Sequence, residues 1–300
     1  MGYHTLPPKT MHCMPSDIRA IEDLKWCIQS PPLMQFEGDQ CWPDEPWFQG
    51  WKLAPITTPK LTEYKLGLRF EAIVAHWIDL EPSLNLLARN LVVHDGKRTI
   101  GEFDLIVENS GTVEHWELAV KFYLGVGDVT NLDNWHGPDP SDTLARKINR
   151  IASHQLRLSQ HPAGQKLLQQ NGWDVYRTRS LVKGRLFHPY QSFRLQQFPV
   201  PPKVNPGHEK GWWMTDTDFE LAPELKRGKF MTLERSNWLA PLLSAGKGQI
   251  MDHSQTVSFL SGIETQGTIP IAQLTADGEE LSRGFVVFPQ WLKDIEAQKV

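Results

Sequence analysis

The chain has 300 residues, enough for one large or two modest domains, and its 40% apolar and 22% charged residues are typical of a globular protein with a packed core. Its net charge of −4 excludes a whole-protein field that attracts nucleic acid, so such a role must rest on a local basic patch. No run approaches the roughly 20 apolar residues that span a bilayer, so no membrane association is expected.

The N-terminal segment and the cysteines both favour a reducing, cytoplasmic setting. The first fifteen residues contain no apolar run of the kind found in signal peptides. The three cysteines, Cys13, Cys27 and Cys41, lie 14 residues apart and form no C-x-x-C pair. This spacing argues against both a disulfide framework and a structural zinc site.

Two amphipathic helices are expected before the first strand. The first covers Asp17 to Gln29 and is stopped by Pro31-Pro32. A Trp-, Pro- and Gly-rich stretch, residues 34–59, then predicts an irregular packed connection. The second and stronger helix covers Leu61 to Leu80, with Thr62 as N-cap. Its apolar stripe has helical spacing and consists of Leu66, Phe70, Ile73, Val74 and Trp77.

Three strands are predicted next. Leu84 to His94 is followed by an Asp95-Gly96 turn, and an Asn109-Ser110-Gly111 turn joins the next two strands. Side chains alternate across a strand, so each strand presents two faces. In the second strand we expect Phe103, Leu105 and Val107 on one face and Glu102, Asp104 and Ile106 on the other. In the third, the two faces are Trp116, Leu118, Val120 and Phe122, and His115, Glu117, Ala119, Lys121 and Tyr123.

Charged residues interrupt these otherwise apolar strands. Asp104, Glu117 and Lys121 fall in strands that are dense in apolar residues on each side. Burying an unpaired carboxylate costs several kcal/mol, on the order of the desolvation penalty of a lone ion. Two carboxylates could offset this cost by sharing a divalent cation, and hard oxygen ligands suit Mg²⁺ or Mn²⁺. The alternative is an internal ion-pair network without metal.

Two further residues have open assignments. Glu71 lies beside the apolar stripe of the second helix, where it is either a solvated flank or a carboxylate directed at the strand pair. His115, next to Trp116, is expected to pack or to support a neighbouring group rather than to bind a ligand directly.

A long Gly-, Asp- and Asn-rich loop, residues 125–140, precedes the next helix, and loops of this length are often functional. The helix is expected from Ser141 to Gln160, with Gln155 inside its apolar stripe of Leu144, Ile148, Ile151 and Leu158. A separate basic stripe on this helix is either a solvated face or a surface that contacts phosphates. It consists of Lys147, Arg150, His154 and Arg157.

A short helix is expected from Gln165 to Asn171, and one or two strands from Asp174 to Phe187. The stretch from Val175 to Arg194 carries five basic residues and no acid, namely Arg177, Arg179, Lys183, Arg185 and Arg194. Residues 199–206 resemble a linker, and aromatic and aliphatic stretches beyond it indicate that the C-terminal third is folded. We therefore expect an N-terminal extension (1–60), a core (61–195) and a C-terminal extension packed on the core (196–300).

Several blocks resemble the bacterial domain-of-unknown-function family 1853. The most specific is Trp116 to Gly125, which reads W-E-L-A-V-K-F-Y-L-G. The others are Leu24-Lys25-Trp26 with Ser30 to Leu33, Gly101 to Asp104, Gly137-Pro138 with Asp142 and Lys147, His154 to Leu156, and Val182 to Phe187. The resemblance spans most of the chain. It implies membership of the PD-(D/E)XK, restriction-endonuclease-like superfamily, whose core is a helix, a mixed sheet of about four strands and a second helix.

The resemblance also implies site residues. Asp104 would match the Asp that ends the second core strand, and Lys121 the lysine of the third. Glu71 would match an acid on the first core helix, and Gln155 a polar residue on the later helix. The superfamily's usual acid lies two residues before the lysine, where this chain has Ala119, whereas Glu117 lies four before on the same strand face.

The expected fold is therefore an α/β restriction-endonuclease-like core, a central mixed sheet flanked by helices. The expected activity is Mg²⁺- or Mn²⁺-dependent hydrolysis of phosphodiester bonds in nucleic acid, with DNA favoured. Asp104, Glu117 and Glu71 would hold the metal, and Lys121 and Gln155 would assist. Nucleic acid would be held by Lys147, Arg150, His154, Arg157, Arg177, Arg179, Lys183 and Arg185.

Other classes of function stay open. The chain could be an inactive nuclease-fold module that binds nucleic acid, a protein-interaction scaffold, or a hydrolase of another substrate. It has no G-x-x-x-x-G-K-[ST], G-x-S-x-G or H-E-x-x-H motif, so ATPase, esterase and zinc-protease readings have no support from motifs.

Overall fold

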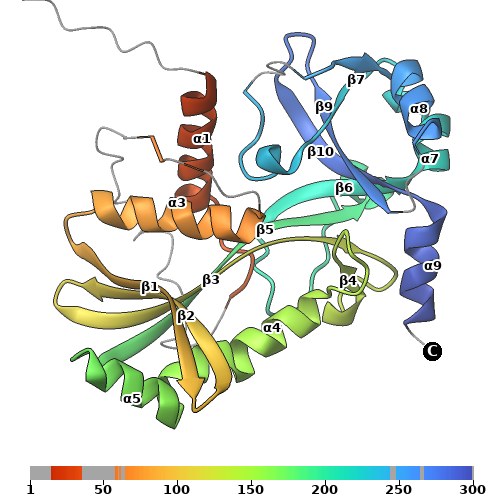
Figure 1. The fold of residues 1–300 in the computed structure, drawn as a ribbon. Helices are drawn as coiled ribbons and strands as arrows, with labels where there is room; N and C mark the ends of the chain where they lie inside the picture. The colour runs from red at the N-terminus through yellow and green to blue at the C-terminus, as the bar shows by residue number, and fades with distance from the viewer. Residues whose placement is uncertain are drawn as a thin grey trace, which may run out of the picture.

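The computed structural model describes residues 15–35, 58, 59, 61, 65–243, 248–263 and 267–298. Within these ranges the strands form one mixed ten-stranded sheet in the order β1-β2-β3-β5-β6-β10-β9-β7-β8, with β4 paired to β3 (Figure 1). The predicted α/β class with a central mixed sheet is confirmed. Thr62, Cys13, Cys41 and most of the 34–59 connection lie outside the described residues.

The first half of the sheet has a simple connectivity. Its strands are β1 (Leu84–Asp95), β2 (Arg98–Asn109), β3 (Thr112–Gly125), the short β4 (Trp135–His136) and β5 (Val175–Pro189). β1, β2 and β3 form an antiparallel meander, and β5 then lies parallel to β3. The predicted turn between β2 and β3 is present, with Ser110 and Gly111 at φ angles of 50° and 82°.

Helices cover both faces of this half. α1 (Pro15–Gln29) and α3 (Leu66–Leu80) lie on one face, and α4 (Leu144–Ser153) and α5 (Pro162–Gln170) lie on the other (Figure 1). The predicted stripe of α3 is buried except at Leu66, which is partly buried against the same cluster, and Trp77 stacks on Trp116 of β3 with ring centroids 6.4 Å apart. The opposite face of β3 packs Ala119 and Tyr123 against the apolar side of α4.

The 141–160 segment differs from its prediction. The helix begins at Leu144, with the Thr143 side chain accepting from the Arg146 N–H, and it ends at Ser153. His154 has φ −127° and ψ −62°, and the chain continues as the 3₁₀ helix η3 (Gln155–Gln160). The predicted single helix with one continuous basic stripe is therefore wrong. Gln155 is the first residue of η3, and its side chain bonds Glu117 of β3.

The predicted alternation of β2 is also wrong at one residue. Leu105 and Val107 pack in the cluster beneath α3, as expected, but Phe103 packs with Ile106 in the cluster beside α5. On the neighbouring strand β1, Asn90 lies between the Leu91–Phe103 and Arg89–Leu105 pairs and has a φ of 53°. This left-handed residue bends the ribbon, so the simple two-face pattern does not continue across Asp104.

The 125–140 segment is more ordered than a simple loop. It contains the 3₁₀ turn η2 (Leu132–Asn134) and strand β4, whose His136 pairs with Leu124 of β3. The predicted strand region 174–187 is one strand, β5, and the predicted 165–171 helix corresponds to α5.

The C-terminal third extends the same sheet. Its strands are β6 (Glu209–Thr215), β7 (Lys229–Thr232), β8 (Met251–Asp252), β9 (Thr268–Leu274) and β10 (Glu280–Val287). Its helices are α6 (Tyr190–Arg194), α7 (Asp216–Leu221), α8 (His253–Ser261) and α9 (Pro289–Ala297), with the 3₁₀ turns η4 (Pro223–Leu225) and η5 (Arg235–Asn237). β6 lies parallel to β5 and to β10, and β9, β7 and β8 follow in antiparallel order.

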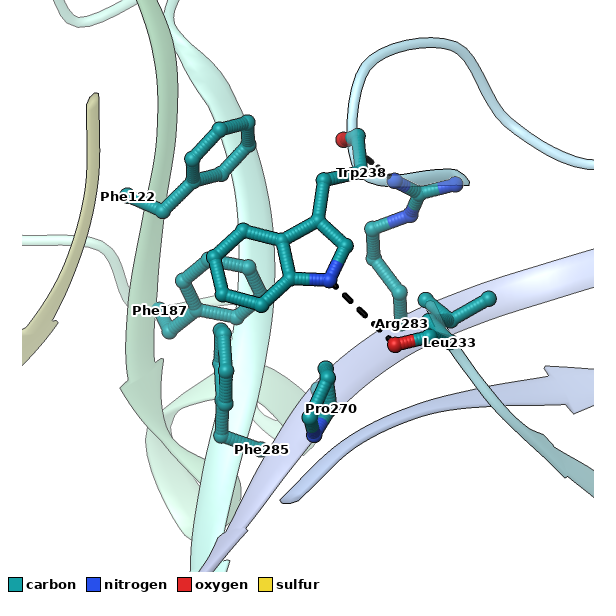
Figure 2. Close-up of a pocket in the computed structure, with 8 residues that line it drawn as sticks. Phe122, Phe187, Leu233, Trp238, Pro270, Arg283 and Phe285 are labelled. Atoms are coloured by element: carbon teal, nitrogen blue, oxygen red, sulfur yellow. Dashed lines mark hydrogen bonds between the residues drawn. The ribbon is translucent and has the colours of Figure 1, made fainter. Parts of the chain in front are cut away.

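An aromatic cluster joins this third to the core. Trp238 meets Phe122 of β3 and Phe285 of β10 edge-on, with ring centroids 5.4 Å apart in both pairs (Figure 2). Phe187 of β5 meets Phe285 at 4.7 Å, and the Trp238 indole N–H donates to the Leu233 carbonyl. The sheet and this cluster are continuous across residue 195, and the predicted domain boundaries at residues 60 and 195 stay predictions.

Gly184 provides a test of the β3–β5 pairing. It has a φ of 145° and lies opposite Lys121, and an added Cβ would overlap the Lys121 backbone oxygen. We expect Gly184→Ala to lower the free energy of unfolding by about 3 kcal/mol or more, measured by urea denaturation. Gly67 on α3 has no atom within 4 Å of such a Cβ, so Gly67→Ala is the control and should be neutral or stabilising. A Gly184→Ala protein as stable as wild type would contradict this pairing.

Candidate active site

The site lies where β2 and β3 separate. Their ladder runs from the Asn109–Thr112 pair to the Leu105–Trp116 pair and stops there. The next residues along the two strands are Asp104 and Glu117. The backbone N–H of Leu118, which would continue the ladder, instead donates to Asp104 Oδ2 at 2.8 Å. A buried N–H needs an acceptor, so this bond fixes the Asp104 carboxylate in the gap between the strands.

Glu117 is held on both carboxylate oxygens. The side chain is only 2% exposed, and its Oε1 lies 2.8 Å from His115 Nε2. Its Oε2 accepts from Gln155 Nε2 at 2.6 Å. Ser180 of β5 lies beside Glu117 in the register, and its buried hydroxyl has no hydrogen-bond partner among the described residues. The acidic group is thus oriented by its neighbours before any ligand binds.

Three carboxyl groups at this point hold their protons unusually tightly. Burial, and after it the charge of Glu117, raise the pKa of Asp104 to about 7. Burial also raises the pKa of Glu117 to about 8, against the opposing charge of Lys147. The pKa of Glu71 on α3 is raised to about 7 by burial and then by Asp104. Asp104 thus acts on the pKa of Glu71, and Glu117 on that of Asp104, through charge.

His115 supports Glu117 as a neutral group. Burial lowers the pKa of His115 to about 3, so its short contact with Glu117 is a hydrogen bond that involves a neutral imidazole rather than an ion pair. The ring also meets Phe103 edge-on at 4.7 Å. This position agrees with a supporting role for His115.

The two lysines near the site have different partners. Lys121 Nζ lies 2.6 Å from Asp142, whose other oxygen accepts from the Tyr123 hydroxyl at 3.2 Å. Lys147 of α4 is half-buried and donates to Gln155 Oε1 at 3.3 Å. Burial and the charge of Lys121 lower the pKa of Lys147, while Asp104 and Glu117 act in the opposite direction.

Apart from Lys147, the predicted nucleic-acid contacts fall into two groups. Arg150, His154 and Arg157 are exposed, and Arg177 is partly exposed. The other three strand residues are buried, and their placement does not support contacts with phosphates. Arg179 forms a two-bond pair with Glu114, Lys183 donates to the carbonyls of Ile28 and Ser30, and Arg185 pairs with Glu209.

The described residues contain no group of three or more His, Cys, Asp or Glu side chains placed to hold a metal ion. Glu71 thus does not complete a three-ligand set with the predicted ligands Asp104 and Glu117. Its influence on them is through charge. A metal at this point would take two protein carboxylates.

Comparisons with known proteins identify a family. A family model described as "Domain of unknown function (DUF1853)" matches residues 22–287. No curated protein and no solved structure matches the chain. In the part of the chain that the structure describes, no helix has the length and apolar character needed to cross a membrane.

The Asp104 pKa predicts how stability depends on pH. A carboxyl whose pKa rises from 3.8 to about 7 on folding binds its proton more tightly in the folded protein. Its contribution to stability is therefore fully present at low pH and is lost as pH rises from about 4 to 7. Asp104→Asn keeps an oxygen for the Leu118 N–H and removes the charge.

In EDTA, we expect the excess of Asp104→Asn over wild type in free energy of unfolding to be about 1–3 kcal/mol larger at pH 8 than at pH 5. Urea denaturation at the two pH values measures this difference. The exposed Asp95 of β1 supplies the control, because Asp95→Asn should behave alike at both. Equal effects of Asp104→Asn at pH 5 and pH 8 would contradict the charge repulsion described here.

Proposed function

The chain belongs to the DUF1853 family, and we propose that it is a nuclease that hydrolyses phosphodiester bonds of nucleic acid with a divalent cation at Asp104 and Glu117. The observation that carries the proposal is the meeting of these two carboxylates in the gap between β2 and β3, with raised pKa values and each held in a fixed orientation. Such a costly arrangement is typical of functional sites.

The order of elements supports a restriction-endonuclease-like core. α3 is followed by the antiparallel β1-β2-β3 meander, and the parallel strand β5 comes after η2, β4, α4, η3 and α5. Asp104 and Glu117 lie on the second and third strands of this unit, and Glu71 and Gln155 come from opposite sides of the sheet. The resemblance implies these positions for Asp104, Glu71 and Gln155, whereas its usual acid position is that of Ala119 rather than Glu117.

The residues fit Mg²⁺ or Mn²⁺. Mg²⁺ is usually bound by one or two carboxylates, with water and substrate phosphates completing its shell, so Asp104 and Glu117 suffice as protein ligands. The unpartnered Ser180 hydroxyl adds a further oxygen beside Glu117. When bound, the ion would polarise the phosphodiester and lower the pKa of a coordinated water.

Hydrolysis forms a bond from a water oxygen to phosphorus and breaks one ester P–O bond, and a water proton ends on the leaving oxygen. The residues of the chain hold the two proposed metal ligands in fixed orientations before this reaction. Leu118 N–H orients Asp104, and His115 and Gln155 orient Glu117. Preorganised groups of this kind need no rearrangement during the reaction.

Ala119 does not remove the second acid from the site. In the structure Ala119 packs against the apolar side of α4, whereas Glu117 is the β3 residue that follows the last ladder pair opposite Asp104. The shift of the acid along the strand thus places it beside Asp104. This supports Glu117 as the second carboxylate of the proposed site.

The proposal predicts cleavage of DNA or RNA that requires Mg²⁺ or Mn²⁺ and stops with EDTA. Asp104→Asn and Glu117→Gln should each reduce the rate roughly 100-fold or more, since each removes a proposed metal ligand. Gel assays of labelled single- and double-stranded substrates measure the rates, and Asp95→Asn is the control.

Two other results would overturn the proposed hydrolysis. If wild type binds nucleic acid but cuts neither DNA nor RNA with either ion, the chain is a binding module. If it binds none even at ~50 mM salt, a protein-interaction role is favoured.

The exposed cations of α4 and η3 predict a second effect. Because phosphate contacts dominate affinity, replacing both Arg150 and Arg157 by Ala should weaken the binding of nucleic acid, measured with Ca²⁺ in place of Mg²⁺ or Mn²⁺. The slope of the logarithm of the binding constant against the logarithm of the salt concentration should decrease in magnitude by about 2. Fluorescence anisotropy at several salt concentrations measures the slope. The exposed Lys166 on α5 provides the control, and an unchanged slope in the double variant would place the nucleic acid elsewhere.

A further inference from the structure

Lys121, the lysine expected to act in the site, forms an ion pair outside it. Lys121 is bound to Asp142, and the same carboxylate also accepts from Tyr123, so the Lys121 ammonium is held against an anion on the loop before α4. Its charge is largely compensated there. Ala119, the β3 residue between Glu117 and Lys121 on the same face, has no amino group in its side chain.

A different lysine is connected to the carboxylates. Lys147 donates to Gln155 Oε1, and Gln155 Nε2 donates to Glu117 Oε2. The orientation of the Gln155 amide follows from chemistry, because the Lys147 ammonium can only donate and therefore requires the amide oxygen. A flipped amide would place NH₂ against the ammonium and oxygen against the carboxylate. Gln155 therefore holds the cation at one end and the acid at the other.

The charges agree with this geometry. Burial is the main influence on Glu117, and among the charges that act on it Lys147 has the strongest effect. Lys147 also acts on Asp104 and on Glu71. Residue 147 as a whole is partly exposed.

We infer that Lys147, not Lys121, is the cation that contacts the scissile phosphate, and that Gln155 positions it beside Glu117. The inference rests on the proposed nuclease function. As the water oxygen bonds to phosphorus and before the ester P–O bond breaks, negative charge grows on the non-bridging phosphate oxygens. The protonated Lys147 ammonium neutralises this charge and keeps its own protons throughout.

Matched variants of the two lysines test the inference on the full chain with Mn²⁺. Lys147→Met should lower kcat roughly 100-fold, whereas Lys121→Met should change it only a few-fold. Lys147→Arg should recover part of the loss, since it keeps the charge. Gln155→Leu should lower kcat through loss of positioning, with a smaller change in KM.

A metal-free readout separates a site role from a structural one. In EDTA at pH 8, Lys147→Met should lower Tm by more in the wild-type background than in the Asp104→Asn background. The reason is that Lys147 compensates one negative charge fewer when Asp104 is replaced by Asn. Lys121→Met should show no such dependence on Asp104 but should depend on Asp142→Asn. Equal Tm changes for Lys147→Met in both backgrounds would overturn its placement among the carboxylates.

The activity results distinguish the two claims. A wild type that cuts nothing overturns the proposed function, and the inference with it. A wild type that cuts, with Lys147→Met equally fast, overturns the inference alone. If Lys121→Met is the variant that loses about 100-fold, the role returns to Lys121.

Discussion

The hydrogen bond from the Leu118 N–H to the Asp104 carboxylate is the interaction on which the site depends. Where β2 leaves β3, the backbone of β3 loses its strand partner, and a side chain of β2 takes its place. This hydrogen bond holds Asp104 in the plane of the sheet, next to Glu117. Groups from both helical layers also act on these carboxyl groups through charge, namely Glu71 from α3 and Lys147 from α4.

The surrounding fold tolerates this concentration of like charge because β3 is well anchored on its other side. β3 pairs with β5 from Val113 to Leu124, and its apolar face lies in the main core beneath α1 and α3. Buried pairs such as Arg179–Glu114 compensate other charges of the sheet fully. The carboxylates in the gap between β2 and β3 have no ion pair of this kind among the described residues. This is the pattern expected when a functional site is retained at some expense of stability.

Local patterns predicted the elements that build the site, and non-local contacts decided the rest. Helical spacing identified the buried face of α3, alternation placed Glu117 and Lys121 on one face of β3, and the apolar stripe placed Gln155 inward. The bend opposite Asn90 and the break at His154 depend on tertiary packing, and no local pattern marked them. The bases of β5 looked unpaired because their partners, such as Glu114 and Glu209, lie on other strands. Likewise, Lys121 fits a sequence motif, whereas its bond to Asp142 and the link from Lys147 to Glu117 through Gln155 require the folded chain.

The central claim is that Asp104 and Glu117 together form a divalent-cation site. Anomalous X-ray diffraction from crystals soaked in Mn²⁺ tests it most directly. The account predicts one anomalous peak with carboxylate oxygens of both residues at ~2.0–2.6 Å, and its loss in crystals of Asp104→Asn. A saturating soak that leaves this gap without a peak, or a peak bound by neither carboxylate, would contradict it.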